Sequence, residues 1–464
     1  MYIRSVKLKN IRCFPELEWS LENRPTRAGW HVILGDNGTG KSTFLRAISI
    51  AILGASRVEA LVNLYSYIRT DRDLGNATVQ IDRDWKLDAI IGPDSLDIES
   101  DRRSMLKDDS LGLSNNGNSY LLLSNTYHAS VVLAKNRDGT VYAPEEIPSH
   151  KTDSEWRLVK RYGTSGWFSA GYGSLRRITG GDHELDKRLA SNTDIARHFT
   201  LLSEAAALTE SITWLQSLEF AKLSKDADAV SIDNVRDLIN QPGFLPNDVR
   251  LGKVTNRAVE FQDANGISSP IEDLGDGYRS VLAMTLDLVR QLSVAYRGRE
   301  LFTKHGKKIT IDLPGVVLID EIDVHLHPTW QRQIGPWFRR HFPNIQFIVT
   351  THSPLVCQAA ADGGSIFLLP SPGTEETGRF LEGIELDRLL YGDILDAYST
   401  EAFGAGITRS EEAQKLYERL AVLNVKLLTG KLTAKERNER QHLQSIFASS
   451  LGFSPNALEN GAEH

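Results

Sequence analysis

The chain has 464 residues, of which 41% are hydrophobic and 24% are charged, a balance that suits one large domain or two to three ordinary ones. Its net charge of -7 and its pI of about 6.0 exclude a surface that coats nucleic acid by bulk charge, but leave room for a local basic patch. Cys13 and Cys357 have no metal-type or C-x-x-C spacing, so we expect a reducing cytoplasm. We find no signal peptide and no apolar run of 18 residues, which predicts no contact with a membrane.

The first 53 residues predict strands and a helix on either side of a glycine-rich loop. Residues 1–21 alternate between apolar and polar side chains, which predicts two strands. Residues 30–35, WHVILG, are a short apolar run typical of a buried strand. Residues 42–53, STFLRAISIAIL, have the apolar spacing of a helix. The loop GDNGTGKST therefore joins a buried strand to a helix.

This loop matches the pattern G-x-x-x-x-G-K-S/T, which binds phosphate when it lies between a strand and a helix. Glycines let backbone N–H groups approach phosphate oxygens, and the helix N-terminus adds a favourable dipole. Lys41 is expected to reach the β- and γ-phosphates, and Ser42 to ligate Mg²⁺. A chance glycine-rich turn is the alternative, which the flanking strand and helix disfavour. The expected nucleotide-binding residues are Gly35, Asp36, Asn37, Gly38, Thr39, Gly40, Lys41, Ser42 and Thr43.

The middle of the chain predicts an insertion, a helical part and a strand meander. Residues 76–92 return to strand, and residues 92–155 are polar with turn signals, as in an insertion of short strands and loops. Residues 184–225 have a helical pattern. Residues 249–274 predict a strand meander with a turn at residues 264–266.

A second glycine loop occurs in IEDLGDGYRS, residues 271–280. Gly275 and Gly277 precede a helical run at residues 278–292, so the loop has the geometry of an anion site at a helix N-terminus. It has no lysine and cannot neutralise a triphosphate, which leaves a backbone cradle for one terminal phosphate. The alternative is a helix N-cap turn whose glycines allow tight packing, and the loop taken alone favours it.

Two further motifs follow apolar strands. VVLIDEID, residues 316–323, brings Asp320 and Glu321 to the carboxyl end of a strand, where open α/β sheets bind ligands. Asp320 can hold the Mg²⁺ shell, and Glu321 can orient or deprotonate an attacking water. His352 follows the next apolar strand and could hydrogen-bond a γ-phosphate. The alternatives are a solvated acidic turn and a structural histidine.

The rest of the chain is predicted to be helical. Residues 328–342 begin with a proline suited to a first helical turn and place apolar side chains on one face. The last part predicts a hairpin of two helices, because Gly430 suits a C-cap and Thr433 with Glu436 forms a capping box. The first of these helices is expected to bury one stripe, formed by Leu416, Leu420, Leu423 and Leu427. From about Thr408 this hairpin is the expected surface for an oligomer or a partner.

The order of these motifs resembles that of ABC-type ATPases. In that family the loop resembling Leu274, Gly275, Asp276 and Gly277 is the signature motif, which docks on ATP held by a second protomer. This sequence departs from the common L-S-G-G-Q form, because Gly275 replaces the serine and Tyr278 the glutamine. DEIDVHLHP and TTHSP are similar to forms in the RecF/SMC and overcoming-lysogenization-defect (OLD) groups. In size and layout the chain resembles the ATPases of Septu antiphage systems, which work with an HNH nuclease.

This resemblance implies an α/β fold: an ABC-ATPase head with a mixed sheet, an inserted helical lobe and a C-terminal helical hairpin. It divides the chain into an N-terminal lobe with the phosphate loop, an insertion, a helical lobe, a second part of the head and a C-terminal region for oligomer or partner contact. The boundaries expected for these five parts are 1–91, 92–155, 156–250, 251–370 and 371–464.

The resemblance also implies the chemistry and the partners. ATP and Mg²⁺ are the expected cofactors, with Glu321 and His352 as catalytic residues and Ser42 and Asp320 as metal ligands. Asp323 is expected in the loop that couples two ATP sites. The family implies a homo-oligomer, at least a dimer of heads, and an HNH nuclease partner. The sequence has neither a TOPRIM pattern nor an H-N-H cluster, so we expect no nuclease site of its own.

Two alternatives stay open at the level of sequence. A RecF-like DNA repair ATPase would bind DNA directly, through the basic clusters Arg157-Lys160-Arg161, Arg176-Arg177 and Arg339-Arg340. The ATPase subunit of a transporter is disfavoured, because such subunits are usually shorter and carry L-S-G-G-Q.

The glutamine of the family's Q-loop has only Gln80 as a candidate. If the signature motif contacts phosphate, Gly277→Asp should put a carboxylate where the γ-phosphate docks.

Overall fold

The computed structural model describes residues 2–21, 28–54, 58–59, 62–67, 85–92, 127–135, 141–142, 168–176, 193–204, 208–224, 230–297, 299–374, 376–398, 400–403 and 410–447. The chain divides into two compact units, Met1–Ile394 and Leu395–His464. Gln80 lies outside the described residues. Among the helices of the described part of the chain, none is long and apolar enough to cross a membrane.

A six-stranded sheet in the order β16-β15-β3-β14-β13-β7 forms the centre of the first unit. The neighbours from β15 to β7 run parallel, and only β16 is antiparallel to its neighbour β15. Strands β13 and β14 are buried along their whole length, as their unbroken apolar sequences predict. The strands are β3 (Gly29–Leu34), β7 (Ser169–Tyr172), β13 (Gly315–Ile319), β14 (Ile345–Thr350), β15 (Ser365–Leu368) and β16 (Arg379–Phe380).

A second, antiparallel sheet has the order β2-β1-β4-β5-β6. It confirms the two strands predicted at the start of the chain. Its outer strands β5 and β6 come from the segment expected to be an insertion, so part of that segment extends this sheet. The strands are β1 (Tyr2–Ile11), β2 (Phe14–Ser20), β4 (Trp85–Gly92), β5 (Tyr127–Lys135) and β6 (Val141–Tyr142). Together the two sheets confirm an α/β fold with parallel and antiparallel strands.

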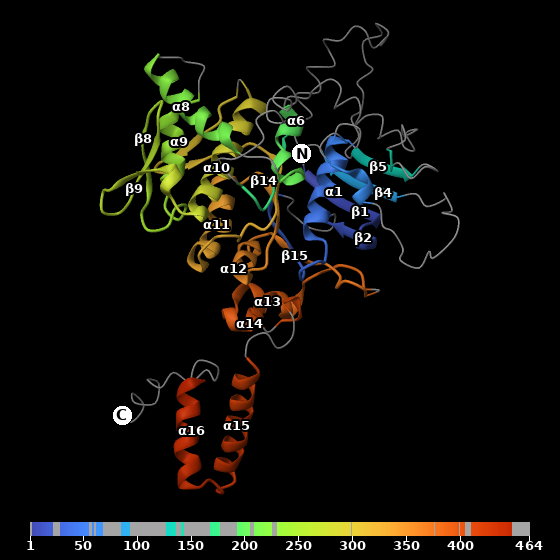
Figure 1. Cartoon of the computed structure of the whole chain (residues 1–464), viewed down its shortest axis with the longest axis vertical. Coiled ribbons are helices and arrows are strands. Elements are labelled where there is room, and N and C mark those ends of the chain that lie inside the picture. The colour runs from blue at the N-terminus through green and yellow to red at the C-terminus, as the bar shows by residue number, and fades with distance from the viewer. Residues whose placement is uncertain are drawn as a thin grey trace. The chain divides into compact units, whose positions relative to one another are not determined.

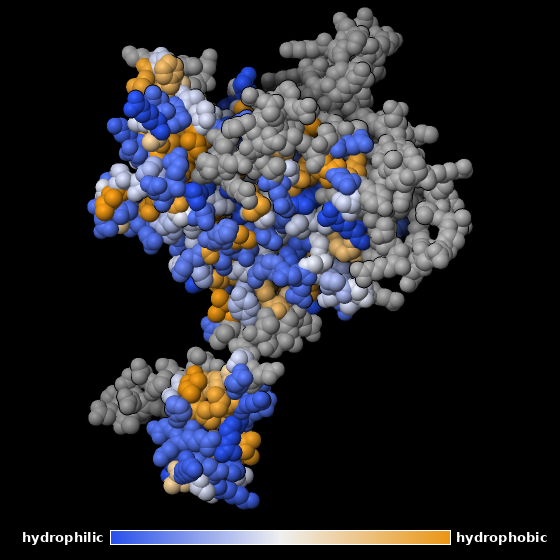
Figure 2. Space-filling model, in the orientation of Figure 1, coloured by the Kyte–Doolittle hydropathy of each residue, from blue (hydrophilic) through white to orange (hydrophobic). Residues whose placement is uncertain are grey.

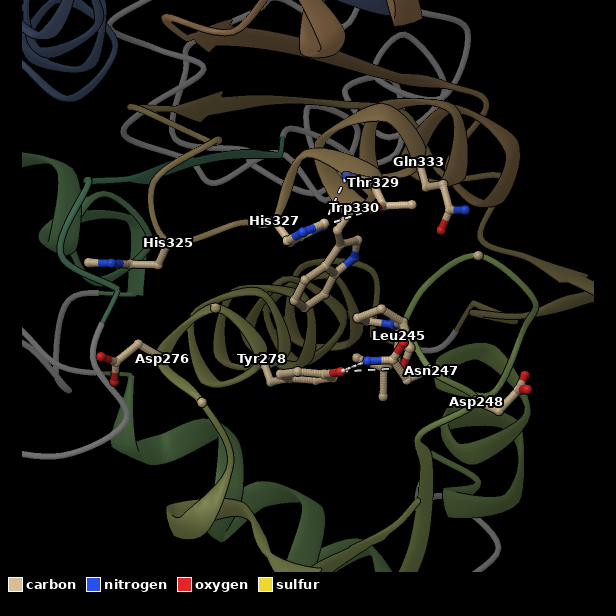
Figure 3. A pocket seen from close by; sticks show the side chains of 14 residues that line it. Leu245, Asn247, Asp248, Asp276, Tyr278, His325, His327, Thr329, Trp330 and Gln333 are labelled. Carbon is tan, nitrogen blue, oxygen red and sulfur yellow. Dashed lines mark hydrogen bonds between the residues drawn. The ribbon is translucent and has the colours of Figure 1, made fainter. Parts of the chain in front are cut away.

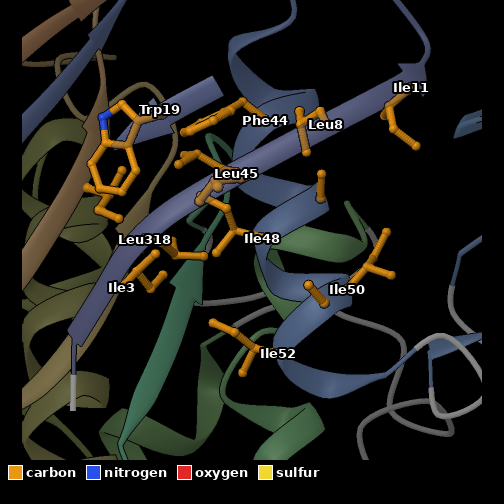
Figure 4. Packing of buried hydrophobic residues seen from close by; sticks show 14 of the residues in the cluster. Ile3, Leu8, Ile11, Trp19, Phe44, Leu45, Ile48, Ile50, Ile52 and Leu318 are labelled. Atoms are coloured by element: carbon orange, nitrogen blue, oxygen red, sulfur yellow. The ribbon is translucent and has the colours of Figure 1, made fainter. Parts of the chain in front are cut away.

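Helix α1 (Lys41–Leu53) packs with both sheets in one hydrophobic core. Figure 4 shows Ile3 and Leu8 of β1 facing Ile48 of α1, with Leu318 of β13 beside them. All four side chains are at most 1% exposed. The helix that follows the phosphate loop is therefore fixed by packing on both sides, which holds the loop at its N-terminus in place.

A group of helices and short strands lies beside the sheet, around α10 (Figure 1). Helix α8 packs against α10 and α9, and β8 and β9 form the predicted meander with β10. The expected turn at residues 264–266 is present, and Gly266 has a φ of 81° there. These elements are α8 (Thr209–Leu223), α9 (Ile232–Ile239), β8 (Arg250–Val254), β9 (Val259–Gln262), β10 (Ser268–Pro270) and α10 (Asp276–Ala295). The short helices α6 (Thr193–Ala196) and α7 (Phe199–Leu202) precede them, and α7 packs against β7 and α1.

The remaining elements of the first unit follow the second glycine loop along the chain. Strand β16 pairs with β15, and α13 packs against the turn at Gln358–Ala360, so β16 and α13 are part of the first unit. The elements are β11 (Thr303–His305), β12 (Lys308–Thr310), α11 (Pro328–His341), α12 (Pro354–Cys357) and α13 (Gly383–Tyr391).

The second unit contains the predicted helical hairpin, α15 (Glu411–Leu428) and α16 (Ala434–Ile446). Gly430 has a φ of 68°, and the capping box of Thr433 and Glu436 is present, as predicted. The predicted stripe of four leucines is narrower in the structure: the middle two are buried, whereas Leu416 is 43% and Leu427 41% exposed. Leu416 is exposed because the next residue, Tyr417, packs against Phe447 in its place. Figure 2 shows hydrophobic side chains on the surface of this hairpin.

A buried amide connects the two sheets of the first unit. The backbone N–H of Ile3 donates to Oε1 of Gln346 at 2.8 Å, and Nε2 of Gln346 donates to the Ile3 carbonyl at 2.9 Å. Ile3 lies where the β1–β4 register shifts, so the amide of Gln346, on β14, supplies bonds to this irregular point.

We expect Gln346→Leu to lower the free energy of unfolding by about 2–4 kcal/mol, because it leaves two buried backbone groups of Ile3 without partners. Gln262→Leu is the control, since the exposed amide of Gln262 donates only to the Gly266 carbonyl. Denaturant unfolding followed by tryptophan fluorescence measures both variants. Equal stability losses in the two would show that the Gln346 bridge contributes nothing.

Candidate nucleotide-binding site

The phosphate loop joins β3 to α1, as the sequence predicted. Gly38 and Gly40 have φ values of 84° and 96°, left-handed conformations that favour glycine. Gly40 is also needed for space, because a Cβ there would collide with Cys13 in the β1–β2 turn and with Phe14 at the start of β2. A Cβ at Gly38 would meet nothing within 4 Å. Gly38 therefore serves the backbone conformation alone, while Gly40 also lets the loop pack against the first hairpin.

Lys41 is the first residue of α1, and its side chain folds back over the loop. Its Nζ donates to the carbonyl of Gly35 at 2.7 Å and to that of Asp36 at 2.8 Å. Burial lowers the pKa of the Lys41 ammonium group, and the charges of Glu321 and Asp320 oppose that shift. The loop thus holds a cation close to the two acids that the sequence singled out.

The strand order explains how these groups meet. Strand β14 pairs with β3 on one side and with β13 on the other, and all three are parallel. Their carboxyl ends therefore share one edge of the sheet, where β3 leads into the phosphate loop, β13 into Asp320 and Glu321, and β14 into His352. This edge is the place where open α/β sheets bind ligands.

Thr350, the last residue of β14, links the two acids. Its hydroxyl donates to Oδ1 of Asp320 at 2.6 Å and accepts the backbone N–H of Glu321 at 2.7 Å. Asp320 is only 2% exposed, and Glu321 is partly buried. Glu321 has a φ of 47°, a left-handed conformation that is rare outside glycine and that clusters at functional sites. The hydroxyl thus fixes the direction of one acid and the backbone of the other.

The remaining predicted residues lie around the same edge. His352 is exposed at the end of β14, and Ser42 is half-buried in the first turn of α1. Asp323 accepts a hydrogen bond from the Thr351 hydroxyl at 2.6 Å. Arg12, from the β1–β2 turn, donates to the Thr43 hydroxyl at 3.3 Å. The structure therefore gathers the phosphate loop, the acid pair and the histidine into one site.

The second glycine loop lies elsewhere, at the N-terminus of α10, which begins at Asp276 with Gly275 as its N-cap. Neither glycine has a left-handed φ. Gly277 is buried, and a Cβ on it would come within 2.5 Å of the His325 carbonyl oxygen. Gly275 is exposed, and a Cβ on it would meet only the Tyr278 ring, at 3.9 Å. Gly277 therefore serves tight packing, whereas Gly275 leaves the surface open.

Beside Gly275 there is a pocket of about 820 Å³ (Figure 3). The second glycine loop, residues 243–248 and the segment from His325 to Gln333 line it. The rings of Tyr278 and Trp330 pack against each other in its lining, with centroids 5.1 Å apart. The open side of this loop thus faces a pocket that the phosphate loop does not line.

Sequence reasoning placed Arg176 in a basic cluster, but the structure buries it beside the acid pair. It is 4% exposed and donates to the carbonyl oxygens of Gly173 at 2.8 Å, Asp320 at 2.7 Å and Glu321 at 3.1 Å. Its position four residues after β7 is the signal that could have revealed it, because β7 lies parallel to β13 and ends at the same edge.

A second residue from these clusters, Arg339, is also bound within the chain. It donates to the carbonyls of Ala359 and Asp362 and forms an ion pair with the Asp362 carboxylate. The cluster of residues 157–161 and Arg177 lie outside the described residues. In the described part, therefore, two of the arginines proposed for DNA contact have internal partners instead.

The residues of this site fit a nucleoside triphosphate with Mg²⁺. The loop supplies a lysine and a helix N-terminus, which suit phosphate oxygens. Among the described residues there is no group of three or more His, Cys, Asp or Glu that could hold a metal ion alone. Mg²⁺ is usually held by one or two protein ligands together with substrate phosphates, and Ser42 and Asp320 match that arrangement.

Two family models match the segments that carry these motifs. The family model described as "AAA domain, putative AbiEii toxin, Type IV TA system" matches residues 164–358, from β7 past His352, and the model "AAA domain" matches residues 5–89, with the phosphate loop. A solved structure, the SMC head bound to the C-winged helix domain of ScpA, aligns with a TM-score of 0.42 and 14% identity over 83% of this chain and 99% of that chain.

Three curated relatives are similar in sequence. Septu protein PtuA of Bacillus mycoides (strain KBAB4) is 23% identical over 410 residues, which are 86% of this chain and 45% of that protein. The Retron Vc95 probable ATPase of Vibrio cholerae serotype O1 biovar El Tor is 24% identical over 76% of this chain and 71% of that protein. The Retron Ec83 probable ATPase of Escherichia coli is 42% identical over 107 residues, 23% of this chain and 18% of that protein. The chain thus spans less than half the length of two of these relatives.

The matched segments carry the phosphate loop, the second glycine loop, the acid pair and the histidine in the order predicted. In its motifs and in its α/β fold the chain resembles ABC-type ATPases. Among known proteins it resembles Septu PtuA, over most of its own length. This confirms the resemblance drawn from the sequence.

We expect Thr350→Val to lower the free energy of unfolding by about 1–3 kcal/mol, because it keeps the β-branched shape but removes the hydroxyl that bonds to Asp320 and Glu321. Thr310→Val is the matched control, since Thr310 is also buried and makes only a 3.4 Å bond to the Thr303 carbonyl. Denaturant unfolding compares the two. A Thr350→Val variant as stable as the control variant would contradict the bridging role.

Proposed function

We propose that this protein binds and hydrolyses ATP at the edge formed by β3, β14 and β13. The observation that carries this proposal is the convergence there of Lys41, Asp320, Glu321 and His352 from three neighbouring parallel strands. Parallel strands bring these groups together although more than 300 residues separate the first from the last.

Each residue has a role that follows from its chemistry. Lys41 and the backbone of the phosphate loop bind the phosphates, and Ser42 with Asp320 would hold Mg²⁺, which neutralises charge that develops on the phosphate oxygens. Glu321 orients and deprotonates the attacking water, because it is only partly buried, whereas its neighbour Asp320 is almost completely buried. His352, exposed beside it, can donate a hydrogen bond to the terminal phosphate.

We further propose that ATP is sandwiched between two protomers, with the second glycine loop of one copy docking on the nucleotide of the other. Gly275 and Asp276 are exposed at the N-terminus of α10, and their pocket excludes the phosphate loop of the same chain. Backbone N–H groups at such a helix end can bind a phosphate without a lysine. Asp323, tied to Thr351 after β14, lies between the acid pair and the His325 segment that packs on this loop.

The role proposed for this ATPase is control of a partner nuclease of HNH type in antiphage defence. The support is the likeness to Septu PtuA and to two retron ATPases. The hairpin of α15 and α16 is the proposed partner or oligomer surface, since Val422, Val425 and Leu428 on α15 are 49%, 60% and 87% exposed. A RecF-like protein that binds DNA directly has less support, because Arg176 and Arg339 are bound within the chain.

Glu321→Gln should still bind ATP but lower the hydrolysis rate by about 10²–10⁴-fold, because an amide cannot accept the proton of the water. The trapped nucleotide should then stabilise a dimer or a higher oligomer in sedimentation experiments with ATP. Glu300→Gln, a change at an exposed glutamate outside this edge, is the control and should behave as the wild type. A Glu321→Gln protein that stays monomeric with bound ATP would contradict the sandwich.

Gly275→Asp tests the docking loop better than Gly277→Asp. A side chain at Gly275 enters open space and would set a carboxylate against the partner's phosphate, whereas a side chain at Gly277 collides with the His325 carbonyl within the same chain. We expect Gly275→Asp to keep ATP affinity and the melting temperature of the wild type but to lose ATP-dependent assembly and hydrolysis. Ala264→Asp, in the exposed turn of the meander and without a left-handed backbone, is the control for adding an acid. Normal assembly of Gly275→Asp would show that the loop only caps α10.

A further inference from the structure

Arg176 forms a bridge that the motifs of the sequence do not assign. It follows β7 and is almost completely buried. Besides its bonds to the Gly173, Asp320 and Glu321 carbonyls, its Nε donates to the Ser280 hydroxyl at 3.0 Å. Ser280 lies in the first turns of α10, the helix that begins at the second glycine loop. One guanidinium therefore contacts three elements: the end of β7, the acid pair after β13 and the start of α10.

The position of this cation is set by hydrogen bonds to neutral groups. Its partners are three main-chain carbonyls and one hydroxyl. Burial lowers the pKa of Arg176 to about 10, and the nearby acids oppose that shift. Arg176 therefore keeps its charge at neutral pH. A planar guanidinium presents its donors in a rigid fork, so a shift of one partner moves the others, which a flexible lysine would not transmit.

At Glu321 this bridge completes a clamp. Thr350 binds the backbone N–H of Glu321, and Arg176 binds its carbonyl, so the peptide groups on both sides of the left-handed Glu321 are fixed. The hydroxyl of Tyr172, the last residue of β7, donates to Asp287 further along α10 at 3.1 Å. The end of β7 is thus joined to α10 at two points, and through Arg176 to the backbone that aims Glu321.

We propose that Arg176 is a positioning residue that couples the placement of α10 to the orientation of Glu321 in the same protomer. This inference rests on the proposed ATPase function. When the second glycine loop docks on a partner's nucleotide, any shift of α10 moves Ser280 and, through the guanidinium, the Asp320 and Glu321 carbonyls. Hydrolysis in one site would then depend on the docking made by the same chain at the other site.

The experiment compares Arg176→Lys, Ser280→Ala and the double variant with the wild type. ATP dissociation constants, hydrolysis rates and melting temperatures are measured for each. Arg176→Lys should lower kcat about 10–100-fold while the dissociation constant stays within about 2-fold, because the phosphate loop is intact and only the aim of Glu321 changes. Ser280→Ala should lower kcat about 3–10-fold by the same route, with little further loss in the double variant, since both residues act through one bridge.

Arg339→Lys is the matched control, because Arg339 also binds main-chain carbonyls but at the surface turn of residues 359–362. It should keep the wild-type kcat. A wild-type kcat in Arg176→Lys, or independent and multiplying losses in the double variant, would overturn the coupling. If Arg176→Lys does not fold, Ser280→Ala alone decides, and an unchanged kcat then rejects the inference. A wild-type protein that neither binds nor hydrolyses ATP would instead refute the proposed function itself.

Discussion

The pairing of β14 between β3 and β13 is the constraint on which the candidate site depends. It brings a loop from the first tenth of the chain against acids and a histidine from the last third, and it does so at the edge where the strands end. The Thr350 hydroxyl, at the end of the middle strand, then fixes both acids, since it bonds to the Asp320 carboxylate and to the backbone N–H of Glu321. Without the middle strand, the lysine and the acids would have no common frame.

Groups on this edge also offset the unfavourable free energy of placing two acids side by side in a partly buried site. Asp320 and Glu321 are adjacent carboxylates, one of them almost fully buried, which repel each other and lose hydration. Burial lowers the pKa values of the cations Lys41 and Arg176, and the charges of these acids oppose that shift. Thr350 donates to the buried acid. The left-handed backbone at Glu321 adds strain of the kind that surrounding bonds must hold in place. Such a site is stable only as a set, which explains why it needs three strands and an arginine from a fourth.

The sequence alone predicted the features that depend on a local pattern of residues. The phosphate loop, the buried strands before Asp320 and His352, the meander turn and the capping box at Thr433 all follow from residue type and spacing over a few positions. It failed where long-range packing decides. The exposure of Leu416 depends on Tyr417 meeting Phe447, and the burial of Arg176 depends on β7 lying next to β13, and neither neighbour is visible in a local window.

In the second glycine loop, too, a long-range contact decides what the local sequence leaves open. From the sequence, its two glycines were equivalent, and a phosphate cradle competed with a tight helix cap. The structure separates them, because Gly277 packs on the His325 carbonyl while Gly275 is exposed beside an open pocket. The tight packing therefore belongs to Gly277, and the proposed phosphate contact falls to Gly275. The packed residue fixes α10 against the segment that follows the acid pair, and this fixation is what lets the exposed residue report, through α10 and Arg176, on whatever docks there.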